Sequence, residues 1–354
     1  MLDSQYRLMK QYEKNEERGM HIFVTGATGV LGKTVVPSLR AFGHVVMITS
    51  GDHQDDVSPT KGSIRMSTTN ASGSHNQSII REAAQRPQWL DEQLYPFQSR
   101  FVEVEGNRIH YIDEGTGPTL FFVHPGIGWS LMYSDIIKDL RSRFRCVALD
   151  LPGFGLSPAT PGYQHTLIGD SRLLERFIQT LGLTDVILLG HDVTGAIALG
   201  VVARRPEWFR AVILLPSFAW PLESYRKVYL MIQLMGSPLF RFLSTQFNFY
   251  LEYILGAVTK KPKQPFSDLE KQAYRGPNLD RAVRRYPHDL FKSVTKSHDY
   301  LADLEQRLCA IKKMPALLIF GDADGSIKMG LLARLERIFP RHRSIVMQGR
   351  THFP

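Results

Sequence analysis

Short apolar runs alternate with longer segments of helical periodicity along most of the chain. Six runs of five residues each lie at 119–123, 145–149, 185–189, 211–215, 316–320 and 343–347. This alternation is typical of a mostly parallel sheet with helices on both faces. Before the first run, FVEVEGNRIHYIDEG predicts an antiparallel hairpin that turns at Glu105-Gly106-Asn107. The pattern therefore predicts an α/β fold built on an eight-stranded, mostly parallel sheet.

The alternation stops between residue 216 and about residue 295. The segment there is helical in pattern and rich in aromatic side chains, as in SYRKVYLMIQLMGSPLFRFLSTQFNFYLEYIL. We expect it to form a helical cap, over about residues 217–295, inserted into a single α/β domain that spans residues 89–354.

The region before this domain has a different character. Residues 20–50 read HIFVTGATGVLGKTVVPSLRAFGHVVMITS, which predicts strand, glycine turn, helix and strand. Residues 51–88 are mostly polar and rich in Ser, Thr, Gly and Asn, which indicates a flexible linker.

Three glycines of the first segment, Gly26, Gly29 and Gly32, follow an apolar strand and open a helix. This context is the one that a dinucleotide fingerprint requires. The segment resembles the first βαβ unit of an extended short-chain dehydrogenase, but a unit of about 30 residues cannot bury a core alone. We therefore predict a partial βαβ fragment over residues 1–50 that binds no cofactor, with nicotinamide binding as the alternative.

Charge, cysteine content and hydropathy narrow the classes of partner. The 354 residues carry a net charge of +9, but the densest basic run is only Lys260-Lys261-Pro262-Lys263 and no nucleic-acid module accompanies it. The stretch 226–258 is interrupted by charged residues, glycine and proline, so we expect no membrane span and no membrane partner. Two cysteines, no C-x-x-C and a charged N-terminus without signal-peptide features predict a cytoplasmic protein.

The sequence GHDVTG at 190–195 follows an apolar run and precedes a helix-like stretch of small residues. It has the form of a nucleophile elbow, in which a tight strand-to-helix turn exposes a side chain above the sheet, but Asp192 occupies the place of serine. Asp324 follows the strand ALLIF, and His352 follows the last predicted strand. Nucleophile, acid and histidine in this order at strand ends predict a catalytic triad.

Other polar residues near these positions have simpler explanations. Asp322 precedes the better-spaced acid, so we expect it to be structural. We also expect His124 and His191 to be buried, hydrogen-bonded structural histidines rather than catalytic residues.

An aspartate at the elbow favours a particular chemistry. Its carboxyl group, with an unperturbed pKa of about 3.9, is already ionised at pH 7. Attack on an acyl carbonyl would give an anhydride, whereas attack on a saturated carbon gives an alkyl ester that a histidine-activated water can hydrolyse. Alkyl halides and epoxides therefore fit better than ordinary carboxylic esters.

Residues 94–354 resemble the haloalkane dehalogenases of the α/β-hydrolase superfamily. The resemblance rests on LYPFQSRFVEVEGNRIHYIDEGTGPTLFFVHPG, WSLMYSDII, RFRCVALDLPGFGLS, GHDVTG, SFAWP, GDAD and THF. It implies an α/β-hydrolase fold, a small apolar organic substrate and no metal or cofactor. It assigns Asp192 as nucleophile, Asp324 as the orienting acid and His352 as base, and the backbone N–H groups of Gly126 and Val193 as oxyanion-hole donors.

Two positions depart from the family pattern on the leaving-group side. Dehalogenases usually have tryptophan directly after the nucleophile, where this chain has Val193. They often have asparagine two residues after the strand-end histidine, where this chain has Gly126. Trp129 or Trp220 could supply the missing donor to the leaving group, although each could instead be an aromatic packed between cap and core.

Epoxide hydrolysis is a further function that fits the same residues. Epoxide hydrolases share the aspartate elbow and use cap tyrosines to protonate the leaving alkoxide. The candidate tyrosines here are Tyr225, Tyr229, Tyr250 and Tyr253.

Two functions of a different kind also stay open. The haloalkane dehalogenases continue past the histidine into a final helix, whereas this sequence ends at Pro354, so we expect the domain to lack that helix. The chain would then be a degenerate hydrolase that binds without turnover. If the glycine motif is functional, the chain would instead be a dinucleotide-binding protein.

Overall fold

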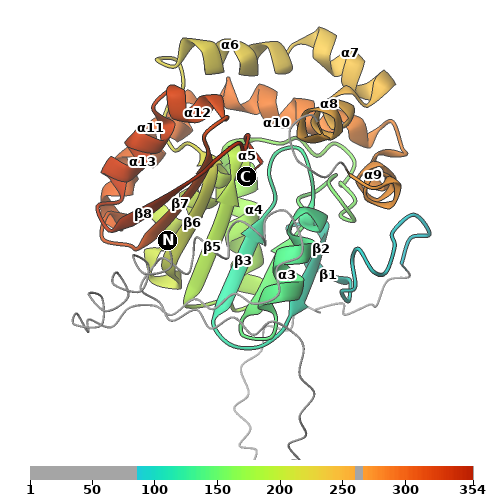
Figure 1. Ribbon diagram of the computed structural model, residues 1–354, viewed down its shortest axis with the longest axis horizontal. Coiled ribbons are helices and arrows are strands. Elements are labelled where there is room, and N and C mark those ends of the chain that lie inside the picture. The colour runs from blue at the N-terminus through green and yellow to red at the C-terminus, as the bar shows by residue number, and fades with distance from the viewer. Residues whose placement is uncertain (1–85, 260–265, 354) are drawn as a thin grey trace, which may run out of the picture.

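The computed structural model describes residues 86–259 and 266–353. Its centre is an eight-stranded sheet in the order β1-β2-β4-β3-β5-β6-β7-β8 (Figure 1). The first pairs, β1 with β2 and β2 with β4, are antiparallel and all later neighbours are parallel. The strands are β1 (Arg100–Val104), β2 (Asn107–Glu114), β3 (Thr119–Val123), β4 (Arg145–Leu149), β5 (Val186–His191), β6 (Phe209–Ser217), β7 (Ala316–Gly321) and β8 (His342–Met347). The predicted α/β-hydrolase fold with a mostly parallel sheet is confirmed.

The hairpin that opens the sheet turns at the predicted place. Its loop is Glu105 and Gly106, whose φ angles are 50° and 75°, and Val104 pairs with Asn107 across it. Two successive residues with positive φ give the backbone twist that matches a pair of right-twisted strands.

Both faces of the sheet are buried, because successive side chains of each strand point to opposite faces. On β3, Phe121 belongs to the core cluster that contains α4 and α5, and its ring stacks on Phe177 at 5.8 Å. The next residue, Phe122, belongs to the cluster on the other face and packs against Tyr133 at 5.3 Å. The helices that flank the sheet are α3 (Ser134–Leu140), α4 (Leu167–Thr180), α5 (Asp192–Arg204), α11 (His298–Arg307), α12 (Gly325–Lys328) and α13 (Leu331–Ile338).

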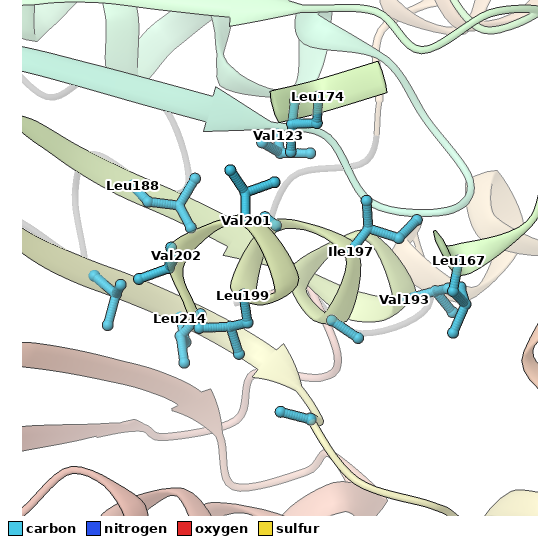
Figure 2. Close-up of a cluster of buried hydrophobic side chains, with 14 of the residues drawn as sticks. Val123, Leu167, Leu174, Leu188, Val193, Ile197, Leu199, Val201, Val202 and Leu214 are labelled. Carbon is cyan, nitrogen blue, oxygen red and sulfur yellow. The ribbon is translucent and has the colours of Figure 1, made fainter. Parts of the chain in front are cut away.

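Helix α5 lies at the centre of the larger cluster. Val193 to Ala203 are all buried, and side chains of this helix lie among those of β3, β5 and β6 (Figure 2). A helix that is apolar on all sides is stable only when other elements surround it. This burial fixes the position of the first residue of α5 relative to the sheet.

Five helices between β6 and β7 form the part that we call the cap. They are α6 (Arg226–Met235), α7 (Pro238–Phe247), α8 (Phe249–Thr259), α9 (Asp268–Arg275) and α10 (Tyr286–Val294). Helices α6 and α7 form the outermost row, with α10 between them and the sheet (Figure 1). Among the described residues, no helix has the length and apolar character needed to cross a bilayer.

The predicted βαβ fragment at 1–50, with Gly26, Gly29 and Gly32, lies outside the described residues, as does the predicted linker up to residue 85.

Candidate active site

The strand-to-helix turn at Asp192 is as tight as the sequence predicts. Strand β5 ends at His191, α5 begins at Asp192, and Asp192 has a φ of 54°, which is rare for a residue with a side chain. A Cβ on Gly195 would lie 2.3 Å from the Ser217 Oγ, so only glycine allows β6 to approach this closely. The Ser217 hydroxyl donates to the Asp192 carbonyl oxygen at 2.8 Å. Packing on both sides therefore holds the strained elbow conformation.

Hydrogen bonds hold the elbow against the loop that follows β3. The Thr194 hydroxyl lies within hydrogen-bond distance of the carbonyl oxygens of His124 and His191. The same loop brings the backbone N–H of Gly126 to the Asp192 carboxylate, where it donates to Oδ2 at 3.2 Å. One oxygen of the predicted nucleophile thus already accepts a backbone hydrogen bond.

The three residues predicted as a triad come together although they lie far apart in the sequence. His352 Nε2 is 3.6 Å from Asp192 Oδ1, and His352 Nδ1 is 3.1 Å from Asp324 Oδ2. Asp324 caps α12 and accepts hydrogen bonds from the backbone N–H and the hydroxyl of Ser326, at 3.1 Å and 2.6 Å. Its carboxylate is therefore fixed in orientation before it meets the imidazole.

The loop that carries His352 is held by close backbone contacts. A Cβ on Gly321 would lie 2.2 Å from the Arg350 carbonyl oxygen, and the Ala323 N–H donates to that same oxygen at 2.9 Å. His191 Nε2–H donates to the His352 carbonyl oxygen at 3.0 Å. The residue before the nucleophile thus positions the backbone of the histidine.

The polar residues that we expect to be structural make structural contacts. His124 Nδ1–H donates to the Pro125 carbonyl at 2.8 Å, and its Nε2 accepts from the Leu151 N–H at 3.0 Å. Asp322 accepts from the Gly349 N–H at 2.7 Å. Burial lowers the pKa of His124 and lowers that of His191 to about 3, so both imidazoles are neutral at pH 7.

The charges of the triad are strongly coupled. Burial alone would raise the pKa of Asp192, but its interaction with the His352 imidazolium, helped by the Gly126 N–H, lowers that pKa below its usual value. The pKa of Asp324 is lowered for similar reasons, despite partial burial. Burial would lower the pKa of His352, but the two carboxylates beside it raise that pKa to about 10. At neutral pH the site therefore holds an imidazolium between two carboxylates.

The opposite side of Asp192 is apolar. The aliphatic side chain of Val193 has no hydrogen-bond donor. It is 1% exposed and belongs to the core cluster that α5 forms with α4 (Figure 2). A Cβ on Gly126 would lie 3.0 Å from Asp192 Oδ2 and 3.2 Å from a methyl group of Leu290 in α10. A longer side chain at position 126 would have to displace Leu290.

Neither predicted tryptophan donates a hydrogen bond to Asp192 in the described part of the chain. Trp129 packs against Trp89 and Tyr95, with ring centroids 6.0 Å and 5.2 Å away. Trp220 lies under the Arg334 guanidinium, 4.5 Å from its ring centre. Both indoles are buried, and the Nε1–H of each has no hydrogen-bond partner among the described residues.

A narrow cavity that begins at Ile127, the residue after Gly126, is lined by a tyrosine that the sequence did not suggest. Ile127, Trp129 and Tyr274 contribute to its lining. The hydroxyl of Tyr274 makes no hydrogen bond within the described residues, and burial raises its pKa. The capping box of Ser267 and Glu270 could have predicted its helix, α9, but not that this helix borders the cavity.

The tyrosines that the sequence suggested have different environments. Tyr250 lines the same cavity as Tyr274, but its hydroxyl donates to the Met235 carbonyl oxygen. Tyr225 accepts from the Arg334 guanidinium at 3.3 Å, and Tyr253 is 60% exposed. Across the described residues, no three His, Cys, Asp or Glu side chains are grouped so that they could bind a metal ion.

Known proteins share this architecture. The model of the family described as alpha/beta hydrolase fold matches residues 118–354. Haloalkane dehalogenase 2 of Mycobacterium tuberculosis is 34% identical over 265 residues, which cover 74% of this chain and 91% of that protein. The cis-3-alkyl-4-alkyloxetan-2-one decarboxylase of Shewanella oneidensis is 29% identical over 244 residues, 65% of this chain and 75% of that protein.

Solved structures agree on the fold. The crystal structure of haloalkane dehalogenase DbeA from Bradyrhizobium elkani superposes with a TM-score of 0.64 at 19% identity, and the match covers 73% of this chain and 91% of that one. The chain therefore belongs to the α/β-hydrolase family and, within it, to the haloalkane dehalogenase-like enzymes.

Proposed function

We propose that this enzyme cleaves a bond between saturated carbon and a leaving group in a small apolar organic substrate, and that a carbon–halogen bond is its main target. Asp192 is the nucleophile, His352 the base and Asp324 the acid that orients it. The observation that carries the proposal is that the two Asp192 carboxylate oxygens have different partners. Oδ2 accepts from the Gly126 N–H, whereas Oδ1 faces His352 Nε2.

The first step follows from this arrangement. Asp192 Oδ1 attacks the substrate carbon, a C–O bond forms, and the carbon–halogen bond breaks with its electron pair leaving on the halide. Oδ2 becomes the carbonyl oxygen of the ester and stays on the Gly126 N–H. The Val193 N–H, in the first turn of α5 where backbone donors lack helical acceptors, is the second proposed donor.

The second step uses the other half of the triad. A water molecule attacks the Asp192 Cγ while His352 Nε2 takes one of its protons, and the negative charge that develops on Oδ2 is stabilised by the backbone donors. Collapse of the intermediate releases the alcohol and restores the carboxylate. Attack at Cγ regenerates Asp192 with one oxygen from water.

The charge on Asp192 also controls when His352 can act as a base. In the resting site two carboxylates raise the pKa of His352. Once Asp192 is esterified one of those negative charges is gone, so the pKa of His352 falls and its proton can leave to solvent. Alkylation thus prepares the base that the hydrolytic step needs.

The leaving-group side supports a second candidate, epoxide hydrolysis. Tyr274, whose hydroxyl has no hydrogen-bond partner among the described residues, and Trp129, whose indole N–H has none either, both line the cavity that begins at Ile127. A phenol can protonate the alkoxide that an opened epoxide leaves behind, whereas a halide needs only a hydrogen-bond donor. In either reaction we propose Tyr274 and Trp129, which line this cavity, ahead of Trp220 as donors to the leaving group.

Trapping the ester tests the proposal. In His352→Gln, incubation with 1-bromobutane should add one butyl group to the peptide that contains Asp192, seen by mass spectrometry, because alkylation proceeds and hydrolysis stops. Asp192→Asn should gain no mass, and His342→Gln, which changes a histidine on β8, should turn over normally. Steady turnover by His352→Gln, or an adduct on another residue, would contradict the mechanism.

A substrate panel tests the leaving group. We expect halide release from bromoalkanes to exceed diol formation from epoxides, and Tyr274→Phe to lower the epoxide reaction more than the halide reaction. A cis-dialkyl oxetan-2-one belongs in the panel, because the Shewanella oneidensis relative is a decarboxylase of such compounds. No adduct and no product with any substrate would instead favour a degenerate hydrolase.

The glycine motif at Gly26, Gly29 and Gly32 needs its own measurement. We expect no change in NADH or NADPH fluorescence on titration with the full chain. Saturable binding that is abolished in Gly26→Val would instead support the alternative that this motif binds a nicotinamide cofactor.

A further inference from the structure

Exposed large apolar side chains are concentrated on one part of the molecule. Among the described residues, seven of them lie on the consecutive helices α6, α7 and α8 and are 51–66% exposed. They are Leu230, Met231, Leu234, Leu239, Phe242, Phe247 and Tyr253. Single exposed apolar residues are normal on a protein surface, but a contiguous group marks a surface that another phase or molecule covers.

Helix α6 shows that this exposure is built into the fold. Val228 and Ile232, four residues apart, are buried and hold the helix on the cap. Leu230 and Leu234, also four residues apart, lie on the opposite face and are 66% and 51% exposed. The helix thus has two apolar faces, of which the protein covers one.

Helix α7 continues this surface. It follows α6 after Gly236 and Ser237, and the two helices form the outermost row of the molecule (Figure 1). Leu239 and Phe242, three residues apart, are 60% and 55% exposed, and the Phe242 ring contacts that of Phe247 at 6.2 Å. The apolar surface therefore extends over both helices.

The charge of this surface has a single sign. Arg226, Lys227 and Arg241 are exposed on the same two helices, and residues 225–251 contain no Asp or Glu. Arg226 and Lys227 form no ion pair within the described residues, whereas Arg241 lies close enough to Asp289 to help lower the pKa of that carboxyl group. The nearest carboxylates along the chain form ion pairs elsewhere: Glu223 pairs with His298, and Glu252 pairs with Arg275.

A groove beside the same helices adds further cations. It has a volume of about 740 Å³, and Arg241, Arg285, Lys292 and Lys296 line it together with three aspartates. Lys292 lies directly under the junction of α6 and α7, because a Cβ on Gly236 would lie 3.0 Å from its Cα. Asp289, one of the aspartates, is paired with His288. Arg285 is paired with Asp289 as well, so Lys292 and Lys296 are the groove cations without an ion pair among the described residues, and they border the apolar surface.

We propose that this cap patch, formed by the seven apolar residues with Arg226, Lys227 and Arg241, docks on the surface of an anionic lipid bilayer. Apolar side chains with flanking cations, and with no carboxylate between residues 225 and 251, match the boundary between acyl chains and anionic headgroups. A second copy of the chain fits less well, because a two-fold contact would place like charges opposite each other without a compensating carboxylate. Helices of ten residues lie in the interface rather than span it.

This proposal replaces the expectation of no membrane partner, and it does not depend on the catalytic mechanism. Helical periodicity shows which side chains share a face, but not whether a neighbouring element covers that face. Only the position of α6 and α7 in the outer row leaves their second apolar face open (Figure 1).

Vesicle flotation with the full chain tests the proposal. Phosphatidylcholine vesicles that contain one-third phosphatidylserine should carry the protein, pure phosphatidylcholine vesicles should carry much less, and high salt should weaken the binding. Arg226→Gln/Lys227→Gln should lower the partition coefficient about 25-fold, since each cation near such a surface contributes about fivefold. Leu230→Gln/Phe242→Gln should lower it further.

Matched control variants distinguish specific binding through the cap patch from nonspecific adsorption to vesicles. Lys312→Gln/Lys313→Gln removes another adjacent pair of exposed cations, just before β7, and Val346→Gln removes an exposed apolar residue of β8. Both should bind vesicles as the wild type does, and all variants should keep its melting temperature. Equal loss in patch and control variants would overturn the proposal. So would sedimentation showing that Phe242→Gln dissociates a dimer of a chain that binds no vesicles.

Discussion

The two sides of Asp192 differ in how they are built. Towards His352 and Asp324, side chains are held by hydrogen bonds from backbone groups and from Ser326. Towards the cap, Val193 and Leu290 present apolar surface. The first side consists of strand ends, which the sheet holds in register. The second combines the first turn of α5 with the cap helix α10. In the proposed mechanism, the hydrolytic half of the reaction therefore depends on the strand ends, and the choice of leaving group depends on the cap side.

Removal of the nucleophile should give the largest effect. Asp192→Asn replaces a carboxylate with a neutral amide in the same volume, so we expect kcat for halide release to fall by about 10⁶-fold. The fold should be unaffected, which circular dichroism and the melting temperature would check. Residual activity within about tenfold of the wild type would show that another residue attacks the substrate.

Removal of the orienting charge should give the next largest effect. Asp324→Asn keeps the Ser326 contacts possible but no longer favours the imidazolium, and we expect kcat to fall by about 10⁴-fold. Ester hydrolysis should slow more than alkylation, so the Asp192 adduct should accumulate in a rapid-quench experiment. Asp322→Asn, two residues away, is the matched control and should retain most of the activity. Equal slowing of both steps would contradict an orienting role.

The boundary between the two sides can be probed at Gly126. In Gly126→Ala the new methyl group would lie 3.0 Å from Asp192 Oδ2 and 3.2 Å from Leu290, so the backbone donor must shift and kcat should fall about 10- to 100-fold. Adding Leu290→Ala should recover part of the loss.

A glycine beside the acid provides the control for this variant. In Gly325→Ala the methyl group would meet only Met329, at 3.4 Å, and we expect little change in kcat. A Gly126→Ala enzyme as active as this control would show that the loop after β3 does not need its observed position.

The smallest effect concerns stability and pH. Because the pKa of His352 is raised on folding, its charge stabilises the fold fully below about pH 6.5, where the unfolded chain is also protonated. This contribution is lost as the pH rises towards 10. The lowered pKa values of Asp192 and Asp324 act oppositely, because their contribution is present above about pH 4 and is lost on acidification.

Comparison with His352→Gln measures this dependence. The free energy of unfolding of the wild type should exceed that of the variant most at about pH 6, and the difference should shrink by pH 9.5. Urea denaturation at the two pH values is the measurement. A difference that grows with pH would mean that His352 is not held between charged carboxylates.

Much of the site can be predicted from sequence because its residues occupy strand ends. GHDVTG, GDAD and THF each follow an apolar run, and parallel strands bring their carboxyl ends to one edge of the sheet. The roles of His191 in anchoring the His352 carbonyl and of Tyr274 in lining the cavity cannot be predicted in this way. Both depend on contacts between segments far apart in the chain.

The sequence by itself determined the sheet, the hairpin turn at Glu105-Gly106 and the order of Asp192, Asp324 and His352, because these depend on local periodicity and on chain order. The tertiary structure decided what surrounds them. It assigned Trp129 to an aromatic cluster, engaged Tyr250 and Tyr225 in hydrogen bonds with the Met235 carbonyl and with Arg334, and left one face of α6 and α7 open. Periodicity specifies a face, but only the packing of distant segments specifies what that face meets.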